Sequence, residues 1–304
     1  MVKTNPLTEY MESFEGQKRH ALGDFSWVNP STPWDKLDLN WREKQLPEYL
    51  RTKHVHRLHP YLGKYVPQLV EIMLRKFNPR IVCDPFCGSG TTLVEANALG
   101  IASIGCDISS FNCLLSRVKT DHYDLPKLVK EVKDIVSKTT TILSDDPKQA
   151  YKLVQDEPSA YLKKWFHKDA LAELLVYRSL IQNYEYDRVL KVILSRSARS
   201  SRLTTHFDLD FPTKPITTPY WCYKHSRHCH PTKNALLFLR RYSEDTVDRI
   251  KQFAEIQTDA PVDIFCDDSR TLGFPELRAP DPLVDLRLLL RERTIRSESL
   301  TDPQ

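Results

Sequence analysis

One segment constrains the fold more than any other part of this sequence: Asp84-Pro85-Phe86-Cys87-Gly88-Ser89-Gly90-Thr91-Thr92. It follows a short apolar run that ends at Cys83, and the residues from Thr91 onward can begin a helix. The two glycines let a strand turn sharply and bring its backbone against a bound ligand. The sequence therefore predicts a strand, a ligand-binding loop and a helix in this order.

A second strand and helix follow directly. The apolar run 102–106 ends beside Asp107, and four apolar residues then recur at helical spacing: Phe111, Leu114, Leu115 and Val118. Upstream, apolar residues from Val66 onward are also spaced as in a helix, and Pro67 stands near its start, where a missing N–H costs little. This alternation predicts an α/β fold with a doubly wound parallel sheet.

The remaining chain divides by pattern. Residues 1–50 are rich in Pro, Trp and charge and predict an irregular arm, which precedes an α/β core over 51–124. Residues 125–257 predict a mainly helical insertion, in which the polar and basic stretch 196–230 is interpreted as surface loops. Residues 258–304 contain a returning core strand, Val262 to Cys266, and an atypical tail.

Composition narrows the class of protein only slightly. A net charge of +4 and a pI of about 8.6 are compatible with a polyanionic partner but do not by themselves indicate one. No apolar run approaches the roughly 20 residues of a membrane span, so we expect no membrane segment and a cytoplasmic location. The odd number of cysteines, seven, favours reduced thiols over a disulfide framework.

Carboxylates at two strand ends indicate the kind of ligand. Asp84 can meet a cationic amino group, while nearby backbone N–H groups can receive a carboxylate. Asp107 stands one strand later, where it can accept hydrogen bonds from both hydroxyls of a ribose. S-adenosyl-L-methionine carries all of these groups. A triphosphate-binding loop is excluded because it requires a lysine after its last glycine, where this sequence has Thr91.

The segment from Asp84 to Thr92 resembles the first motif of the methyltransferases that modify the N4 amino group of cytosine or the N6 amino group of adenine in DNA. The stretch from His59 to Pro67 is similar to the family segment that precedes it, and Asp107 and Asp268 match its ribose and adenine positions. The resemblance implies these cofactor-binding residues: His59, Pro60, Lys64, Tyr65, Asp84, Pro85, Phe86, Cys87, Gly88, Gly90, Thr91, Thr92, Asp107, Ile108, Asp268 and Ser269.

The same resemblance implies a Rossmann-like methyltransferase fold, S-adenosyl-L-methionine as cofactor, DNA as partner and a role in restriction and modification. Two alternatives remain open. One is an RNA methyltransferase of related fold, and the other is a non-catalytic fragment that binds cofactor or DNA.

The catalytic motif of that family, [Asp/Ser/Asn]-Pro-Pro-[Tyr/Phe/Trp], is absent, so no catalytic residue is assigned. The two nearest strings are Thr218-Pro219-Tyr220-Trp221, which lacks a second proline, and Ala279-Pro280-Asp281-Pro282, which lacks an aromatic residue.

Residues 279–293 can be encoded by codons that, in another reading frame, specify Pro-Pro and then an aromatic and acidic stretch. We therefore expect a frameshift near Arg278 and a truncated chain with an incomplete sheet. Either a makeshift strand from Val284 to Leu290 or a complementing second polypeptide would then cover the exposed central strand.

Two further groups of residues are candidates for substrate contact. Arg196, Arg199 and Arg202 recur at three-residue spacing and indicate a basic ridge or a solvated helix end. The stretch 221–230 gathers two cysteines and three histidines among Trp, Tyr, Lys and Arg. Its spacings lack the two separated ligand pairs of a typical zinc site, so we predict no metal site, although metal binding stays open beside nucleic-acid contact and a plain structural loop.

Overall fold

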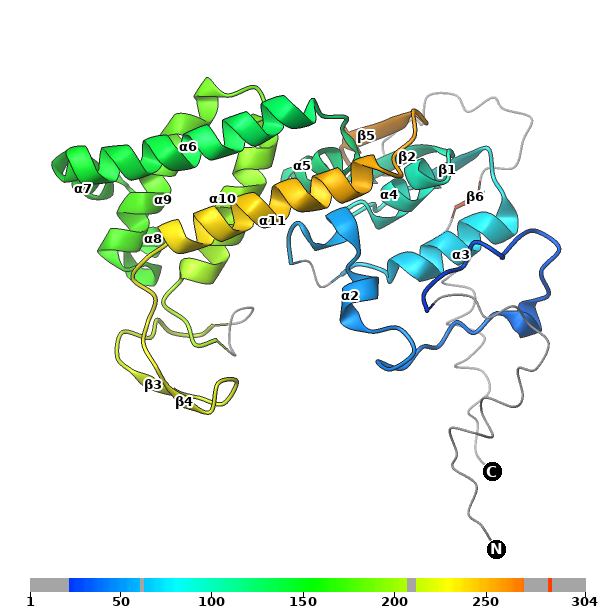
Figure 1. The fold of residues 1–304 in the computed structure, drawn as a ribbon, viewed down its shortest axis with the longest axis horizontal. Coiled ribbons are helices and arrows are strands. Elements are labelled where there is room, and N and C mark those ends of the chain that lie inside the picture. The colour runs from blue at the N-terminus through cyan, green and yellow to red at the C-terminus, as the bar shows by residue number, and fades with distance from the viewer. Residues whose placement is uncertain (1–21, 61–62, 207–211, 271–283, 286–304) are drawn as a thin grey trace, which may run out of the picture.

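The structure of the protein is a computed structural model that describes residues 22–60, 63–206, 212–270 and 284–285. A parallel sheet with its helices lies at one end, and a group of longer helices with a small hairpin lies at the other (Figure 1). The helices are α2 (Glu48–Arg51), α3 (Pro67–Phe77), α4 (Thr91–Ala98), α5 (Ser110–Thr120), α6 (Leu125–Asp145), α7 (Pro147–Asp156), α8 (Ala160–Trp165), α9 (Lys168–Leu180), α10 (Asp187–Ser201) and α11 (Leu236–Ala254). The 3₁₀ helices are η1 (Trp34–Lys36), η2 (His54–Arg57) and η3 (Ile181–Asn183), and the strands are β1 (Ile81–Asp84), β2 (Ala102–Asp107), β3 (Tyr220–Cys222), β4 (Arg227–Cys229), β5 (Val262–Cys266) and β6 (Val284–Asp285).

The larger sheet has its strands in the order β5-β2-β1-β6, and every pair is parallel. The register pairs Asp84 with Gly105 and Asp107 with Cys266. Strands β1 and β2 are buried along most of their length, as continuous apolar runs in a parallel sheet predict. The carboxyl ends of β1, β2 and β5 therefore lie at one edge, and the predicted α/β fold with a parallel sheet is confirmed.

Local sequence signals set the bounds of the helices beside this sheet. Pro67 occupies the first turn of α3, and Asn78 ends that helix in the left-handed conformation, with φ 44°. The side chain of Ser109 caps α5 by accepting the Asn112 N–H, and Asp124 caps α6 in the same way. The helices predicted upstream of β1, after the glycine loop and after β2 are thereby confirmed.

Strand β6 lies on the side of β1 that faces away from β2. Its two residues pair in parallel with Val82 and Cys83. The strand predicted from Val284 to Leu290 is thus confirmed for its first two residues. Residues 286–290 lie outside the described residues, as do residues 271–283 and the rest of the tail, on which the expectation of truncation depends.

The described part of the predicted arm, residues 22–50, holds only short helical turns and packs on α3. Val28 and Leu37 are buried against Ile72 of that helix, with Trp27 and Trp41 partly buried around them. The arm therefore contributes to the protein core, and residues 1–21 lie outside the description.

The helical insertion and the sheet share one apolar core. Val94 and Leu115, from helices beside the sheet, belong to the same buried cluster as Leu128 of α6 and Val192 of α10. The four-part division of the chain stays a prediction, and this continuity shows that the second and third parts pack as one unit. Residues 196–201 were interpreted as loop, which is wrong, because they form the last turns of α10.

Helix α11 joins the two ends of the molecule. It runs from the region of the β3–β4 hairpin to the sheet, where β5 follows it (Figure 1). None of the helices in the described residues is both long and apolar enough to span a membrane.

Candidate functional site

Asp84 ends β1 as a buried carboxylate, only 4% exposed. One of its oxygens accepts the backbone N–H of Phe86 at 3.2 Å, and the other accepts the Thr92 hydroxyl at 2.7 Å. These two bonds hold the side chain at the start of the loop and tie it to the first turn of α4. Buried charge of this kind needs hydrogen bonds to be tolerated, and here the loop provides them.

The glycine loop is bonded directly to the end of the neighbouring strand. The Gly88 N–H donates to Asp107 Oδ2 at 2.9 Å, and the Cys87 N–H donates to the Cys106 carbonyl at 2.8 Å. Gly88 and Gly90 both adopt positive φ values, 52° and 76°, which other residues rarely reach. The two predicted cofactor carboxylates are thus held on either side of one loop, at one edge of the sheet.

Asp107 already accepts three hydrogen bonds. Oδ1 receives the Ser109 N–H at 2.8 Å and the Asn112 amide at 3.1 Å, in addition to the Gly88 N–H on Oδ2. A carboxylate offers about four acceptor positions, so about one remains. Accepting both hydroxyls of a ribose therefore requires one of these three donors to release its bond.

Gly90 is required by packing as well as by its backbone angle. A Cβ at this position would lie 2.7 Å from Ser116 Oγ and 3.2 Å from Ser116 Cα, because α5 crosses behind the loop. Ser116 in turn donates its hydroxyl to the Gly88 carbonyl at 3.0 Å. The loop is therefore held from behind by α5.

Two large apolar side chains are exposed at this same edge. Phe86, in the loop, is 51% exposed, and Ile108, directly after β2, is 78% exposed. Cys87, Thr91 and Thr92 are buried instead, and burial raises the pKa of the Cys87 thiol well above its usual range. The candidate cofactor residues thus divide into a buried set that shapes the loop and an exposed pair that can contact a ligand.

Lys119 is a buried residue of the site that sequence reasoning missed. Its Nζ donates to the Ser89 carbonyl in the glycine loop at 2.5 Å. Burial, together with the nearby Lys64 ammonium, lowers the pKa of Lys119 to about 7. The available signal was a lysine inside the apolar stripe of α5, at a position where a solvated residue is unexpected.

The segment predicted to precede the motif lies beside η2 and α10. His59 contacts the Ser195 hydroxyl at 3.2 Å, and its ring packs edge-on against Phe111. Lys64 donates to the His56 carbonyl at 2.9 Å, and Tyr65 packs against the buried cluster between α3 and β1. Pro60 is exposed, and residues 61–62 lie outside the description. These contacts position the segment beside α5, and the roles of its residues in cofactor binding stay predictions.

Three histidines of this region are held neutral. Burial lowers the pKa of His54 to about 2 and that of His59 to about 4, and it lowers the pKa of the fully buried His56 well below its usual value. His56 Nε2 lies 2.7 Å from Glu95, whose other oxygen receives the Lys53 ammonium at 2.9 Å. The Lys53 charge already balances Glu95, which disfavours a metal cation in this group.

Asp268 and Ser269 follow β5 in a turn at the same edge of the sheet. The side chain of Asp268 bonds to Arg270, with three contacts between 2.6 and 3.1 Å, and these hydrogen bonds lower its pKa to about 2. The preceding Asp267 donates its N–H to the Asp107 carbonyl at 3.2 Å. Asp268 is thus placed near Asp107, while its contact with adenine stays a prediction.

Arg196 does not belong to a basic ridge, so this sequence interpretation is wrong. Arg196 is only 8% exposed. Its guanidinium lies 4.1 Å from the centroid of the Tyr242 ring and forms an ion pair with Asp245 of α11. Arg199 and Arg202 are half-buried. The arginine at 196 therefore ties α10 to α11 and is not available to a phosphate.

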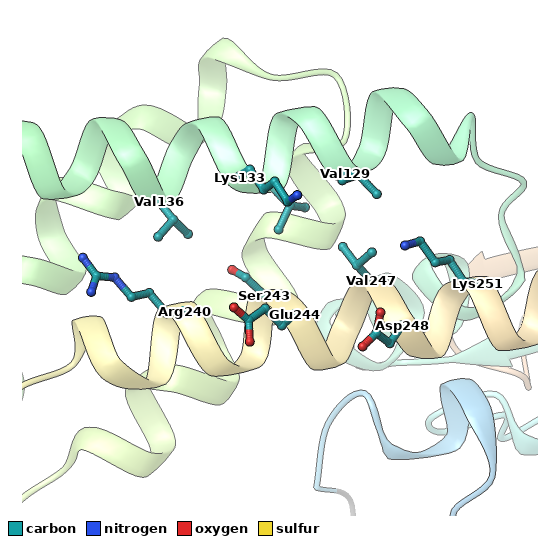
Figure 2. Close-up of a pocket in the computed structure, with 10 residues that line it drawn as sticks. Val129, Lys133, Val136, Arg240, Ser243, Glu244, Val247, Asp248 and Lys251 are labelled. Atoms are coloured by element: carbon teal, nitrogen blue, oxygen red, sulfur yellow. The ribbon is translucent and has the colours of Figure 1, made fainter.

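A groove lies between α6 and α11 in the helical part (Figure 2). Its floor is apolar and its rims carry both signs of charge. The residues that line it are Val129, Val132, Lys133, Val136, Arg240, Ser243, Glu244, Val247, Asp248 and Lys251. It contains no loop that could receive a cofactor, so we place the candidate cofactor site at the sheet edge.

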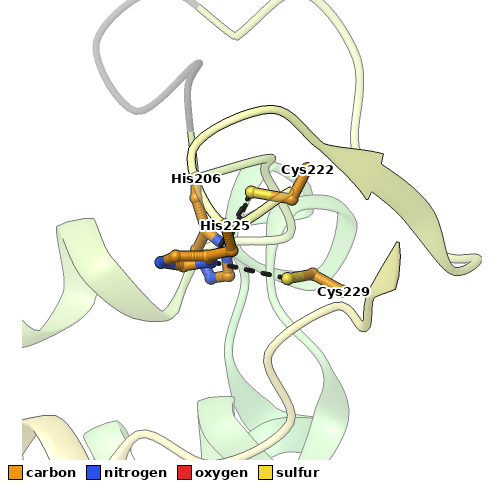
Figure 3. Close-up of side chains that lie close together, drawn as sticks. All are labelled: His206, Cys222, His225 and Cys229. Carbon is orange, nitrogen blue, oxygen red and sulfur yellow. Dashed lines mark hydrogen bonds between the residues drawn. The ribbon is translucent and has the colours of Figure 1, made fainter. Parts of the chain in front are cut away.

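The cysteine and histidine cluster forms a compact group at the opposite end of the molecule from the sheet (Figures 1 and 3). Cys222, His225 and Cys229 come from the β3–β4 hairpin, and His206 joins them from the segment after α10, with all ligand atoms within 4.8 Å of one another. His206 was missed because it stands 16 residues before Cys222. The predicted residues His228 and His230 are exposed and outside this group.

The two strings closest to the missing catalytic motif do not supply it. Tyr220 and Trp221 lie in β3 of the hairpin, away from the sheet edge, and the Tyr220 hydroxyl accepts the His206 N–H at 3.1 Å. Residues 279–282 lie outside the described residues.

The fold and this edge define a class: an α/β protein with a candidate ligand site at the carboxyl ends of parallel strands. Comparison with known proteins identifies the family. The sequence profile of the N6/N4 methyltransferase family, described as DNA methylase, matches residues 5–117. In this region the chain belongs to the amino-group DNA methyltransferase family, whose members use S-adenosyl-L-methionine.

Relatives extend the match beyond the profile. The Type II methyltransferase M.MjaII of Methanocaldococcus jannaschii is 38% identical over an alignment of 305 residues that covers 79% of this chain and 58% of the relative. The Type II methyltransferase M.MvaI of Kocuria varians is 29% identical over 139 residues, covering 43% of this chain and 30% of the relative.

A tRNA (guanine(10)-N2)-dimethyltransferase of M. jannaschii is 33% identical over 95 residues, covering 30% of this chain and 27% of the relative. The chain thus spans little more than half of the length of M.MjaII and less of the other two. No solved structure matches.

Proposed function

We propose that this chain binds S-adenosyl-L-methionine at the carboxyl edge of β1 and β2, in a Rossmann-like fold, and acts in methylation of the N4 amino group of cytosine or the N6 amino group of adenine in DNA. The hydrogen bond from the Gly88 N–H to Asp107 carries this proposal. This bond joins the glycine loop, which would approach the cofactor, to the carboxylate that would bind its ribose, so both groups are preorganised at one place.

The residues at this edge fit such a cofactor chemically. Asp84 provides negative charge next to the amino acid end, and the α4 N-terminus provides N–H groups for its carboxylate. Asp107 accepts from the ribose, and the exposed Phe86 and Ile108 provide apolar surface for the adenine. When bound, the cofactor supplies an electrophilic methyl group.

The comparisons support DNA over RNA as the substrate. The two longer matches are Type II methyltransferases, whereas the match to the tRNA enzyme covers 30% of this chain. The RNA alternative is therefore not favoured. A DNA substrate also agrees with the cytoplasmic location expected from the sequence.

We propose residues 125–257 as the part that contacts the DNA target. The β3–β4 hairpin carries exposed aromatic and basic side chains, with Trp221 49% and Tyr223 82% exposed beside Lys224 and Arg227. Aromatic rings suit stacking on bases, and the cations suit phosphates. An enzyme of this class must also extrude the target base from a duplex.

Calorimetry with S-adenosyl-L-methionine tests the cofactor site. We expect binding, and we expect Asp107→Asn to weaken it by about tenfold or more through loss of one charged hydrogen bond, about 1.4 kcal/mol or above. Asp263→Asn, an exposed acid in β5, is the matched control and should bind as the parent does. No binding by the parent, or equal weakening in both variants, refutes the proposed cofactor site.

Transfer of a labelled methyl group to unmethylated genomic DNA tests the activity. It is measured on this chain and on a frame-restored version that adds the expected Pro-Pro motif. Transfer by the restored version alone would support the expected truncation. Cofactor binding without transfer by either version would instead indicate the non-catalytic alternative.

A further inference from the structure

The group formed by His206, Cys222, His225 and Cys229 has a spacing that hydrogen bonds between its members do not explain. His225 Nδ1 lies 3.6 Å from Cys222 Sγ and 3.5 Å from Cys229 Sγ, and Cys222 Sγ also lies 3.6 Å from His206 Nδ1 (Figure 3). One ring nitrogen has either one hydrogen or one in-plane lone pair, so it serves one thiol and not two. A common partner at the centre of the four atoms accounts for these three separations.

These separations match the edges of a metal tetrahedron. With Zn–S bonds of about 2.3 Å and Zn–N bonds of about 2.0–2.1 Å, tetrahedral coordination places sulfur and nitrogen ligands about 3.5–3.6 Å apart. Three of the four sulfur–nitrogen pairs in the group lie 3.5, 3.6 and 3.6 Å apart. All four ligand atoms also lie within 4.8 Å of one another, as one shared ion requires.

We propose that these four residues form a structural zinc site. Two thiolates and two neutral imidazoles neutralise a divalent cation, and a tetrahedral set of two sulfur and two nitrogen ligands favours zinc. Because the protein supplies all four ligands, no open position remains for a reacting water, which separates this site from a catalytic one. The proposal replaces the expectation of no metal site and does not depend on the cofactor proposal.

The hairpin needs such a cross-link. Strands β3 and β4 have three residues each, and an isolated two-stranded hairpin is marginally stable in water. Its turn holds Ser226 in the left-handed conformation, with φ 49°, and the His225 N–H donates to the Cys222 carbonyl at 3.2 Å. Small units with little core commonly use a metal for stability.

The site also fixes the hairpin to the helical part of the protein. His206 stands in the segment after α10, in which the Leu203 N–H donates to the Trp165 carbonyl at 2.8 Å. The His206 N–H bonds to the Tyr220 hydroxyl, and the His206 ring packs edge-on against those of Tyr220 and His225. Zinc would therefore hold the exposed aromatic and basic face of the hairpin in one orientation.

Metal content of the full chain gives the first test. The protein is purified with a reductant and without chelator, and its zinc content is measured by inductively coupled plasma mass spectrometry. We expect about one zinc ion for each chain, and less than a tenth of that in the Cys222→Ser/Cys229→Ser double variant. Cys266→Ser, at an exposed cysteine outside the group, and His228→Ala, at an exposed histidine of the hairpin, should retain zinc.

Thiol alkylation of the parent protein gives a second test that does not depend on how the variants fold. Removal of zinc by a chelator should increase the alkylation rate of Cys222 and Cys229 by tenfold or more, and added ZnCl₂ should reverse the increase. Cys266 is exposed and should react equally in both states. Trypsin should also cleave after Lys224 and Arg227 faster without the metal, while cleavage elsewhere stays unchanged.

Three measurements of metal content and thiol reactivity would overturn the proposal, and so would one result on disulfide formation. They are a parent protein without stoichiometric zinc after reconstitution, a double variant that retains zinc, and alkylation rates that do not respond to the chelator. A disulfide between Cys222 and Cys229 in the freshly reduced and reconstituted protein would do the same.

Discussion

The packing of the glycine loop on α5 gives a quantitative prediction for Gly90→Ala. An alanine in the left-handed conformation costs roughly 1–2 kcal/mol relative to glycine. A Cβ at Gly90 would also lie 2.7 Å from Ser116 Oγ and 3.0 Å from Ser116 Cβ, and overpacking of this kind costs about 1–3 kcal/mol more. We expect Gly90→Ala to lower the free energy of unfolding by about 2–5 kcal/mol.

Gly100→Ala separates the two contributions. Gly100 has almost the same φ, 72° against 76°, but a Cβ there would meet no atom within 4 Å. It should lose only the conformational part, roughly 1–2 kcal/mol. The difference between the two variants, about 1–3 kcal/mol, therefore measures the contact with α5. At about 2–4 °C for each kcal/mol, it is also visible in the melting temperature.

Urea unfolding followed by circular dichroism measures both variants. A double-mutant cycle with Ser116→Ala checks the assignment, because removing Oγ should restore part of the stability of Gly90→Ala even though it also removes the bond to the Gly88 carbonyl. Equal losses of stability in Gly90→Ala and Gly100→Ala would refute the reasoning, since the contact would then contribute nothing.

Two more predictions concern hydrogen bonding and pH. Thr92→Val should cost about 1.5–3 kcal/mol in unfolding free energy, because it removes the hydroxyl bonded to the buried Asp84 carboxylate. Thr91→Val should cost less, because the Thr91 hydroxyl is buried without a hydrogen-bond partner among the described residues. Chemical denaturation of both variants checks this, and an equal cost would contradict it. Stability should fall below pH 6.5 by up to about 1.4 kcal/mol per pH unit for each of His54, His56 and His59, whose pKa values are lowered, because the unfolded chain binds protons that the native state does not. Urea midpoints between pH 7.5 and 5 should show a shallower slope for His54→Gln and an unchanged slope for His228→Gln; a parent protein with no slope would be the contrary result.

The sequence was sufficient for features that depend on near neighbours. The strand ending at Asp84, the loop and the helix after Gly90 follow from apolar runs and glycine positions, and the structure has all three. Val284 could be placed beside β1 because a central strand without a neighbour attracts another strand. Each of these predictions needs only a few consecutive residues.

Features that depend on distant neighbours could not be predicted. Arg196 has the spacing of a surface residue, but Asp245, its partner, is 49 residues away on α11. Lys119 reaches the loop carbonyl of Ser89 only because α5 packs behind the loop. His206 completes the cysteine and histidine group because the chain returns after 16 residues. Spacing in the sequence contains no information on such returns.

Helix α11 has a consequence for any attempt to exchange parts between relatives. Its 19 residues form one rod about 28 Å long, without glycine or proline, that ends at the sheet. Near that end Arg249 donates to the carbonyls of Thr52 and His54, and Phe253 packs on the His54 ring. A chimera joined at residues 257–258 would carry a foreign α11, and its last turns would then meet the native Thr52 and His54. The compatible crossover lies near the first turn of α11, because it leaves these contacts native and exchanges only the part of the molecule that we propose to contact DNA.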